Sequence, residues 1–437
     1  MDTEKLKQKI LDLAIRGKLV PQDPNDESAE ELIKRIQEEK AKLVKEGKIK
    51  ASKEESVIFK GSDNCYYEKT TKRIIKVDEN FEFPKSWISM KLGNIGDWGA
   101  GATPNRSNKS YYENGDVLWV KTGELNDGYI FDSIEKITTK ALNECSLRNN
   151  NIGDVLIAMY GATIGKLGIA AVPLTTNQAC CACTPFSFIN NEYLFYYLMA
   201  IKPLLISKSY GGAQPNISKE KITNCFINFP KIDEQILIVN KIKELFKKIE
   251  TIDNEYNSII NLISATKRKV LEEIFGENSS YKSYYENEYF LGDLLPYEQP
   301  ALYIVKSTNY DDKYDTPVLT PGKSFILGYT NEKEGVYHVN NSKVIIFDDF
   351  TTASRIIDFD FKVKSSAMKI LKSSDETKFN IDYLFFLLQS LYVNNDTHKR
   401  YWISEFATKK VKVHTFEEQL KIVKNINEFY DILDSIL

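Results

Sequence analysis

The chain has 437 residues, 42% of them apolar and 27% charged, which is ordinary for a globular protein and too long for one domain. Its formal net charge of −3 argues against a strongly basic nucleic-acid-binding chain, although charge can still be segregated on one face. No apolar run approaches the roughly 20 residues of a membrane span, and residues 1–5 lack the apolar core of a signal peptide, so we expect a cytoplasmic protein.

The N-terminal part is predicted to be helical and then irregular. Apolar residues at helical spacing predict a helix over Glu4–Ile15, which Gly17 would end. The capping-box pattern Ser28-Ala29-Glu30-Glu31 opens a charged helix that runs to about Glu46. Residues 47–80 are polar and are interpreted as an irregular bridge.

A glycine-punctuated, β-rich block begins at Phe81. Strands are predicted over Val117–Val120, Val155–Ala158 and Leu167–Ala171, a loop over Gly96–Thr103, and a helix over Asn191–Ile206. One long helix follows at Asp233–Phe275. A polar linker, a second β-rich block over 290–415 and a final helix over Glu417–Leu437 complete the chain.

Three of the six cysteines crowd into Cys180-Cys181-Ala182-Cys183. A metal site would need nearby histidines or a second pair of cysteines at Cys-x-x-Cys spacing, and the three histidines are His338, His398 and His414. We therefore interpret the cysteines as small buried thiols on a strand.

The chain repeats itself. Asp233-Glu234-Gln235-Ile236-Leu237-Ile238-Val239 is echoed by Glu417-Glu418-Gln419-Leu420-Lys421-Ile422-Val423, and the following apolar residues keep the same spacing. Each β-rich block also begins with a Leu-Gly step, at Leu92 and Leu291, and contains a similar helix, over 192–198 and 382–388. The repeat therefore predicts two copies of a β-rich domain followed by a helix.

The helices carry a coiled-coil pattern. Positions 238 to 270 step by four and three without a break, which is typical of a helix that pairs with another. The expected seam is Ile238, Ile242, Leu245, Ile249, Ile252, Tyr256, Ile259, Ile263, Ile422, Ile426, Phe429, Leu433 and Ile436.

The C-terminal helix is about half as long as the central one, and Lys7–Ile15 resembles Lys267–Phe275 at the end of the central helix. We infer that the N-terminal helix continues where the C-terminal helix ends, so that the chain is a pseudo-symmetric ring with antiparallel helices. About 32 residues of coiled coil span roughly 48 Å, or about 14 base pairs of B-DNA. Such a rod would hold two readers at a fixed spacing.

Three stretches of the chain together carry a resemblance to a known family. The first is Leu11–Asp26, the second combines Gly153–Ile157, Gly161–Lys166 and Asn177-Gln178, and the third leads from Gln214–Ser218 to Asp233-Glu234-Gln235. With these stretches the chain resembles the specificity subunits of type I restriction–modification enzymes, in which a segment similar to the first stretch lies beside the coiled-coil helix. The second β-rich block departs from the pattern, because it lacks the Gly-x-Thr-Ile-Gly-Lys and Gln-Pro-Asn-Ile-Ser motifs.

The resemblance implies an α/β (α+β) fold with two β-rich target-recognition domains separated by two long antiparallel coiled-coil helices, in a pseudo-two-fold, circular arrangement. The expected parts are an N-terminal helix that completes the distal helical repeat (1–19), a polar linker with a short helix (20–80), target-recognition domain 1 (81–232), the central coiled-coil helix (233–276), target-recognition domain 2 (277–415) and the C-terminal coiled-coil helix (416–437).

The resemblance also implies partners: double-stranded DNA, two modification (methyltransferase) subunits and the restriction (endonuclease/translocase) subunits. S-adenosylmethionine, ATP and Mg²⁺ would then be cofactors of those subunits. No catalytic motif is found in this sequence, since it has no phosphate-binding loop and no Pro-Pro-aromatic motif for holding a target base.

Base edges are read by polar and basic side chains on loops, and phosphates are bound by Lys, Arg and backbone N–H groups. The candidates for DNA contact are Thr103, Asn105, Arg106, Ser107, Lys109, Lys121, Thr122, Tyr160, Thr163, Lys166, Gln214, Thr351, Thr352, Ser354, Arg355, Lys362, Lys364, Lys399 and Arg400. A plain β-turn is an equal alternative for Gly161–Gly165, and core packing is at least as good an explanation for Tyr401 and Trp402.

The sequence thus predicts the DNA-recognition subunit of a type I complex, reading a bipartite site without catalysis of its own. Two alternatives stay open. One is a self-sufficient methyltransferase or endonuclease with its own recognition domains, and the other is a coiled-coil scaffold without a DNA role. The recognised bases, the gap length and the loops that touch DNA are not determined by the sequence.

Overall fold

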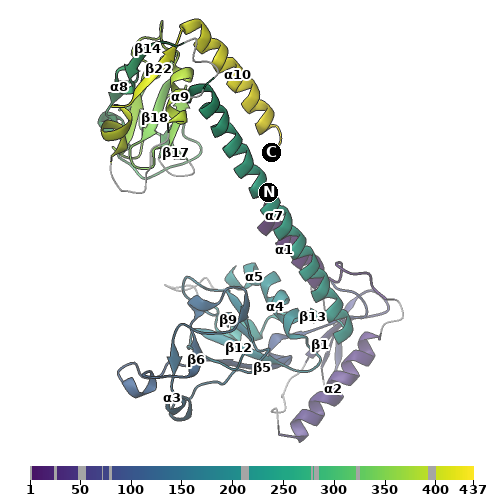
Figure 1. Cartoon of the computed structure of the whole chain (residues 1–437). Helices are drawn as coiled ribbons and strands as arrows, with labels where there is room; N and C mark the ends of the chain where they lie inside the picture. Colours follow the sequence, from purple (N-terminus) through teal and green to yellow (C-terminus); the bar gives the residue numbers. More distant parts are fainter. Residues whose placement is uncertain are drawn as a thin grey trace. The chain divides into compact units, whose positions relative to one another are not determined.

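The computed structural model describes residues 2–23, 27–47, 56–70, 72–77, 81–207, 216–276, 279, 285–320, 325–391 and 400–437. Two compact units divide the chain, Met1–Asn254 and Glu255–Leu437. The helix α7 (Ile232–Phe275) is uninterrupted and contains the boundary between them (Figure 1). Its 44 residues correspond to a length of about 66 Å.

The first unit begins with two capped helices. The side chain of Asp2 accepts a hydrogen bond from the Lys5 N–H at the start of α1 (Thr3–Ile15), and Gly17, with φ of +67°, follows its end. Ser28 and Glu31 form the expected capping box of α2 (Ala29–Lys45).

The segment expected to be a polar linker is partly a sheet. Three short strands, β1 (Ser56–Lys60), β2 (Tyr66–Thr70) and β3 (Ile74–Val77), extend the antiparallel pair β4 (Ile88–Lys91) and β13 (Phe226–Phe229) in the order β13-β4-β1-β2-β3. The prediction for 20–80 was wrong over these residues. The strands are short, and β2 and β3 are only partly buried, while β1 pairs both with its neighbour β2 and with the distant β4.

Two further sheets form the rest of the first unit. One has the order β5-β12-β9-β10-β7 and the other β11-β6-β8. Their bounds are β5 Gly96–Ala100, β6 Val117–Val120, β7 Gly128–Ile130, β8 Lys136–Ile137, β9 Val155–Ala158, β10 Leu167–Ala170, β11 Thr175–Thr176 and β12 Cys180–Pro185. The loop expected over Gly96–Thr103 is therefore a strand up to Ala100, because it pairs with β12.

Among the described residues, the first unit has four α-helices besides α1, α2 and the start of α7. They are α3 (Thr139–Glu144), α4 (Asn191–Ala200), α5 (Lys202–Ser207) and α6 (Lys219–Thr223). In Figure 1, α1 lies along the first half of α7, and the two helices share a core that includes Leu11, Ala14, Ile238 and Ile242.

The second unit repeats the plan of the first. Its sheets have the orders β14-β22, β15-β21-β18-β19 and β17-β16-β20. The bounds are β14 Tyr285–Phe290, β15 Tyr297–Glu298, β16 Thr316–Leu319, β17 Ile326–Thr330, β18 Val344–Asp348, β19 Ser354–Ile357, β20 Lys362–Val363, β21 Met368–Leu371 and β22 Lys410–His414. Its helices are α8 (Leu291–Leu294), α9 (Ile381–Ser390), a π-helical turn (Trp402–Phe406) and α10 (Phe416–Asp434).

Each described strand of the second unit has a counterpart in the first, in the same pairing. In each unit a parallel pair, β6 with β11 or β16 with β20, carries an antiparallel third strand, β8 or β17. Each unit also has an antiparallel set, β5-β12-β9-β10 or β15-β21-β18-β19. In the described part of the second unit, no strands correspond to β1, β2 and β3. The expected mixed fold with two β-rich domains is confirmed.

The two Leu-Gly steps occupy equivalent places. Each follows the strand that pairs with the last strand before a long helix, β4 with β13 and β14 with β22. A Cβ on Gly93 would lie 3.1 Å from the Cβ of Thr223, and one on Gly292 would lie 2.9 Å from the Cβ of Ala407. Glycine is required there because another chain segment passes at contact distance.

The second half of α7 pairs with α10 in antiparallel fashion inside the second unit. Leu271 and Ile274 share a core with Ile422 and Ile426, while Lys267 lies 2.6 Å from the Asp434 carboxylate, farther along α10. The circular arrangement stays a prediction.

The expected seam is not continuous. Its buried members are Ile238, Ile242, Ile249, Ile263, Ile422 and Ile426, and its half-buried members are Leu245, Tyr256 and Leu433. Four positions are exposed, namely Ile252, Ile259, Phe429 and Ile436. The cores that α7 shares with α1 and α10 involve residues toward the two ends of α7, so its middle keeps apolar side chains at the surface.

Candidate nucleic-acid interface

Several loops of the first unit leave one edge of its sheets. The register places Ala100, the last residue of β5, opposite Cys181, and Ala158, the last residue of β9, opposite Cys180. The N–H of Asn177 donates to the carbonyl of Val120, the last residue of β6. Loops 101–109, 121–124, 159–166 and 177–179 therefore form one surface, the first loop edge.

Loop 101–109 is held by side chains around it. The indole of Trp119 donates to the Ala102 carbonyl at 3.0 Å, and the hydroxyl of Tyr112 donates to the Pro104 carbonyl at 2.6 Å. Thr103 donates to the side chain of Gln178. Asn105 accepts from the N–H of Ser107 at 3.1 Å. Thr103, Asn105, Ser107 and Lys109 are all exposed on this anchored loop.

Arg106 and Lys121 converge on one carboxylate. Both Nη atoms of Arg106 donate to Glu135, and the Lys121 ammonium lies 2.9 Å from the same carboxylate. The Arg106 guanidinium also lies 4.6 Å from the ring centre of Tyr112 and 4.8 Å from that of Trp119. The hydrogen bond from Arg106 holds the pKa of Glu135 below its ordinary value.

Loop 159–166 is the β-turn that was the alternative for this segment. The Ile164 N–H donates to the Gly161 carbonyl, and the Lys166 N–H donates to the Thr163 carbonyl. Tyr160 pairs with Asn216 in an isolated bridge. Tyr160, Thr163 and Lys166 are half-buried, as is Thr122, so DNA contact by these residues stays a prediction.

The second unit has an equivalent surface, the second loop edge, formed by loops 349–353 and 364–367. The Lys364 N–H donates to the Leu319 carbonyl at the end of β16, and the Asp349 N–H donates to the Ala367 carbonyl. Asp348 accepts hydrogen bonds from the N–H and the hydroxyl of Thr351, and these bonds order loop 349–353.

The candidates on this surface have different exposure. Thr351, Arg355 and Lys364 are exposed, whereas Thr352 and Ser354 are half-buried. The Arg355 guanidinium lies 4.6 Å from the ring centre of Phe325, and the Lys364 ammonium lies 3.3 Å from the Tyr310 hydroxyl.

The prediction that Lys362 contacts DNA is wrong. Its side chain is buried, with the ammonium 3.2 Å from Glu332 and donating to the Glu334 and Gly335 carbonyls. A lysine satisfied in this way inside the domain cannot contact DNA. The sequence could not reveal this, because Glu332 and Gly335 are brought to Lys362 by the fold.

The remaining candidates lie near or outside the described ranges. Gln214 and Lys399 fall outside the described residues, and Arg400 is exposed at the edge of one range. Tyr401 and Trp402 are fully buried, so core packing is the correct interpretation for them.

Three residues that contact loop 101–109 of the first loop edge were missed as site residues. Trp119 lies in a segment predicted to be a strand, and Gln178 was considered only as part of a family motif. Glu135 is negatively charged, which argues against a place on a DNA-binding surface. Only their contacts with Arg106 and Thr103 reveal them.

The cysteine cluster is structural. Cys180, Cys181 and Cys183 are buried on β12, and burial raises the pKa of Cys181 to about 11 and that of Cys180 to about 12. The residues that the structure describes contain no group of His, Cys, Asp and Glu able to hold a metal ion. None of the helices described is long and apolar enough to span a membrane.

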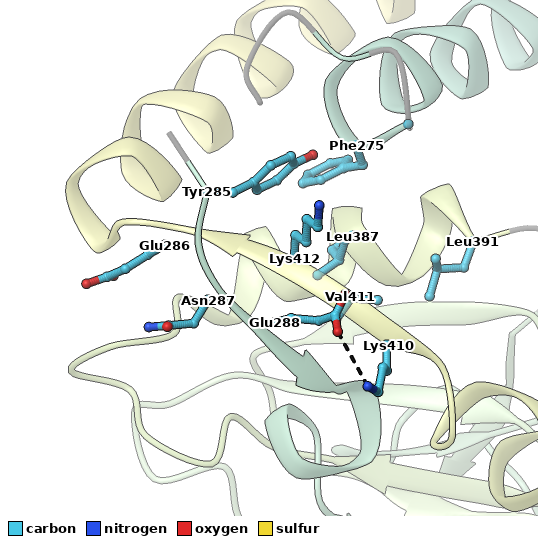
Figure 2. Close-up of a pocket in the computed structure, with 11 residues that line it drawn as sticks. Phe275, Tyr285, Glu286, Asn287, Glu288, Leu387, Leu391, Lys410, Val411 and Lys412 are labelled. Carbon is cyan, nitrogen blue, oxygen red and sulfur yellow. Dashed lines mark ion pairs between the residues drawn. The ribbon is translucent and has the colours of Figure 1, made fainter. Parts of the chain in front are cut away.

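The second unit also contains a cavity of about 790 Å³ between the end of α7, the β14-β22 pair and α9 (Figure 2). An ion pair of 3.6 Å joins Glu288 and Lys410 at its wall. None of the candidate DNA-contacting residues lines it, so it is separate from the second loop edge.

Residues 84–261 match the family described as the type I restriction modification DNA specificity domain. The EcoR124I/EcoR124II specificity subunit of Escherichia coli is 47% identical over 147 residues, which are 33% of this chain and 36% of that subunit. The MjaIX specificity subunit of Methanocaldococcus jannaschii is 28% identical over 305 residues, 68% of each chain. The chain is thus similar to type I specificity subunits, and residues 84–261 match the DNA specificity domain of that family.

A solved structure supports the same fold for this chain. It comes from work on complex assembly and conformational transition of the type I R-M system, and it superposes with a TM-score of 0.59 at 15% identity. The superposition covers 82% of this chain and 93% of the solved one. The match to the Escherichia coli subunit spans only about a third of that subunit's length. The range that matches the family contains every loop of the first loop edge, whereas the second edge lies outside it.

Proposed function

We propose that this specificity subunit reads a split sequence in double-stranded DNA, with one half-site at each loop edge. The observation that carries the proposal is the repeated topology: each unit places polar loops at the same edge of the same strand set. The first edge also lies wholly within the range matched to the DNA specificity domain family. Because the loops differ in sequence, the two half-sites should differ as well.

The proposed DNA-facing set follows from exposure and position. In the first unit it comprises Thr103, Asn105, Arg106, Ser107, Lys109, Lys121, Thr122, Tyr160, Thr163 and Lys166, and in the second Thr351, Thr352, Ser354, Arg355, Lys364 and Arg400. Polar side chains on such loops can reach base edges, while the lysines suit phosphates.

The exposed apolar positions of α7 are proposed to receive the modification subunits. Ile252, Ile259 and Leu262 are 48%, 40% and 67% exposed. Apolar side chains on a long helix favour pairing with helices of a partner. In this proposal the modification and restriction subunits bind S-adenosylmethionine, ATP and Mg²⁺, and this chain supplies recognition alone.

Methylome sequencing tests the proposal. Cells lacking other adenine methyltransferases would express this chain together with its modification subunit, and methylated positions would be mapped across the genome. We expect one bipartite motif with an unread gap of constant length. A continuous motif would contradict the two-reader arrangement, and methylation by the purified chain alone would favour a self-sufficient enzyme.

A further inference from the structure

Arg106 is held in place before any DNA is bound. Its two Nη atoms donate to the Glu135 carboxylate, and its guanidinium lies against the rings of Tyr112 and Trp119. Trp119 is buried, and its indole is fixed by the hydrogen bond to the Ala102 carbonyl. The guanidinium therefore has a defined plane and orientation, although the Arg106 side chain is 51% exposed.

The contacts leave one donor pair of Arg106 unused. A guanidinium has five N–H groups in a rigid fork, and Glu135 takes one from each Nη atom. The Nε atom of Arg106 takes part in no hydrogen bond to the residues that the structure describes. The Nε–H and the adjacent Nη–H are parallel, so they form a second fork free to bind two acceptors.

We propose that Arg106 reads a guanine in the half-site of the first unit and that Glu135 is its positioning residue. The inference rests on the proposed function. In the major groove, guanine presents the O6 and N7 acceptors side by side, and the free fork of a guanidinium matches this pair. Glu135 keeps the fork aimed, so little side-chain freedom is lost on binding.

Charge favours base reading over phosphate binding for this arginine. The Glu135 carboxylate forms ion pairs with both Arg106 and Lys121, so its single negative charge offsets one of the two positive charges. The cluster of these three residues therefore carries a net charge of about +1 at neutral pH. A phosphate contact gains from an uncompensated cation, whereas recognition of a base edge gains from a fixed orientation. Lys109, with a side chain 84% exposed on the same loop, lies 4.0 Å from the exposed Glu113, a weak surface pair that a phosphate can replace, so it is the better phosphate ligand.

The test compares three variants by methylome sequencing of the complex with its modification subunit. Arg106→Lys keeps the charge but removes the fork, and Glu135→Gln keeps the size but weakens the alignment. We expect both to relax one G·C position of one half-site, with Arg106→Lys losing about a 5- to 150-fold preference. Lys109→Ala is the matched control and should reduce methylation at every site without changing the motif.

The second half-site reports that the complex folds and assembles, because Arg106 and Glu135 both lie in the first unit. An unchanged motif in Arg106→Lys, or relaxation at an A·T position, would overturn the inference. If Arg106→Lys abolishes methylation altogether, the motif of Glu135→Gln decides the question. An unchanged motif in that variant, or relaxation at an A·T position, would then overturn the inference. Failure of the proposed function would give a different result from failure of this inference. In that case the chain without any substitution would itself yield no bipartite motif.

Discussion

At the scale of single residues, one glutamine performs the same task in each unit. Gln235 accepts from the Asn190 N–H at 2.9 Å and donates to the Phe188 and Pro230 carbonyls. Gln419 makes the equivalent bonds with the Asn380 N–H and with the Lys378 and His414 carbonyls. Each glutamine is buried at the start of a long helix and ties that helix to the cap of α4 or α9. This network explains why the glutamine occurs twice.

We predict that Gln235→Leu and Gln419→Leu each destabilise their own unit by about 2–5 kcal/mol, because each leaves three buried or part-buried backbone groups without this partner. Hydrogen–deuterium exchange of the full chain would measure the effect, with faster exchange confined to peptides of the altered unit.

Leu237→Ala and Leu420→Ala are the matched controls, since both leucines are exposed on the same helices, and each should change stability by no more than about 0.5 kcal/mol. If the glutamine variants exchange like these controls, the glutamine network does not stabilise the helix starts.

At the scale of elements, helices were predicted more accurately than strands. Apolar spacing and caps placed α1, α7 and α10 within one residue at their starts, because helix signals are local in sequence. The strands β1, β2, β3 and β5 were missed, since they are short, are interrupted by charged residues or glycine, and gain stability from partner strands. The prediction of a continuous seam along α7 rested on the spacing of apolar residues alone. Whether those residues are buried depends on the elements that pack beside them.

The seam residues of α7 should therefore fall into two classes. Ile242→Ala, at a buried position, should cost about 2–5 kcal/mol in the unfolding free energy measured by urea denaturation. Ile259→Asp, at a position 40% exposed, should leave that free energy within about 0.5 kcal/mol.

The same Ile259→Asp change should raise the Kd for the modification subunit at least about tenfold, because it places a charge on the apolar docking surface. Analytical ultracentrifugation of the mixed proteins measures this. Asn257→Asp, an exposed position on the same helix, is the control and should leave assembly intact. Equal Kd values for the two variants would exclude the middle of α7 as the docking surface.

At the scale of the whole molecule, the two units share the pairing of their main strands but differ in their additional strands and in their loop residues. The strands β1, β2 and β3 extend the sheet of the first unit, and the described part of the second unit has no counterpart to them. The loop edges also differ in residue type, with Arg106 beside Trp119 in the first and Arg355 beside Phe325 in the second. A duplicated scaffold with different loops suits a target made of two unlike halves.

Because α7 is one helix that contains the boundary between the units, lengthening it should change the gap between the half-sites. Insertion of four residues within Ile249–Ile263 adds about one helical turn, or about 6 Å. We expect the methylated motif to gain about one or two base pairs in its gap, with both half-sites unchanged. Replacing four residues of the same stretch without insertion should leave the gap as it is. An unchanged gap in the insertion variant would show that α7 does not set the spacing.

The sequence by itself determined the duplication, the long helices with their caps, the buried thiols of β12 and the resemblance to type I specificity subunits. All of these depend on patterns between residues close together in the chain, or on comparison of one segment with another. Only the tertiary structure decided that residues 56–77 join a sheet, that Lys362 is buried beside Glu332, and that Glu135 lies against Arg106. The physical reason is the same in each case: a polar side chain or a short strand takes its role from the partner that the fold brings to it.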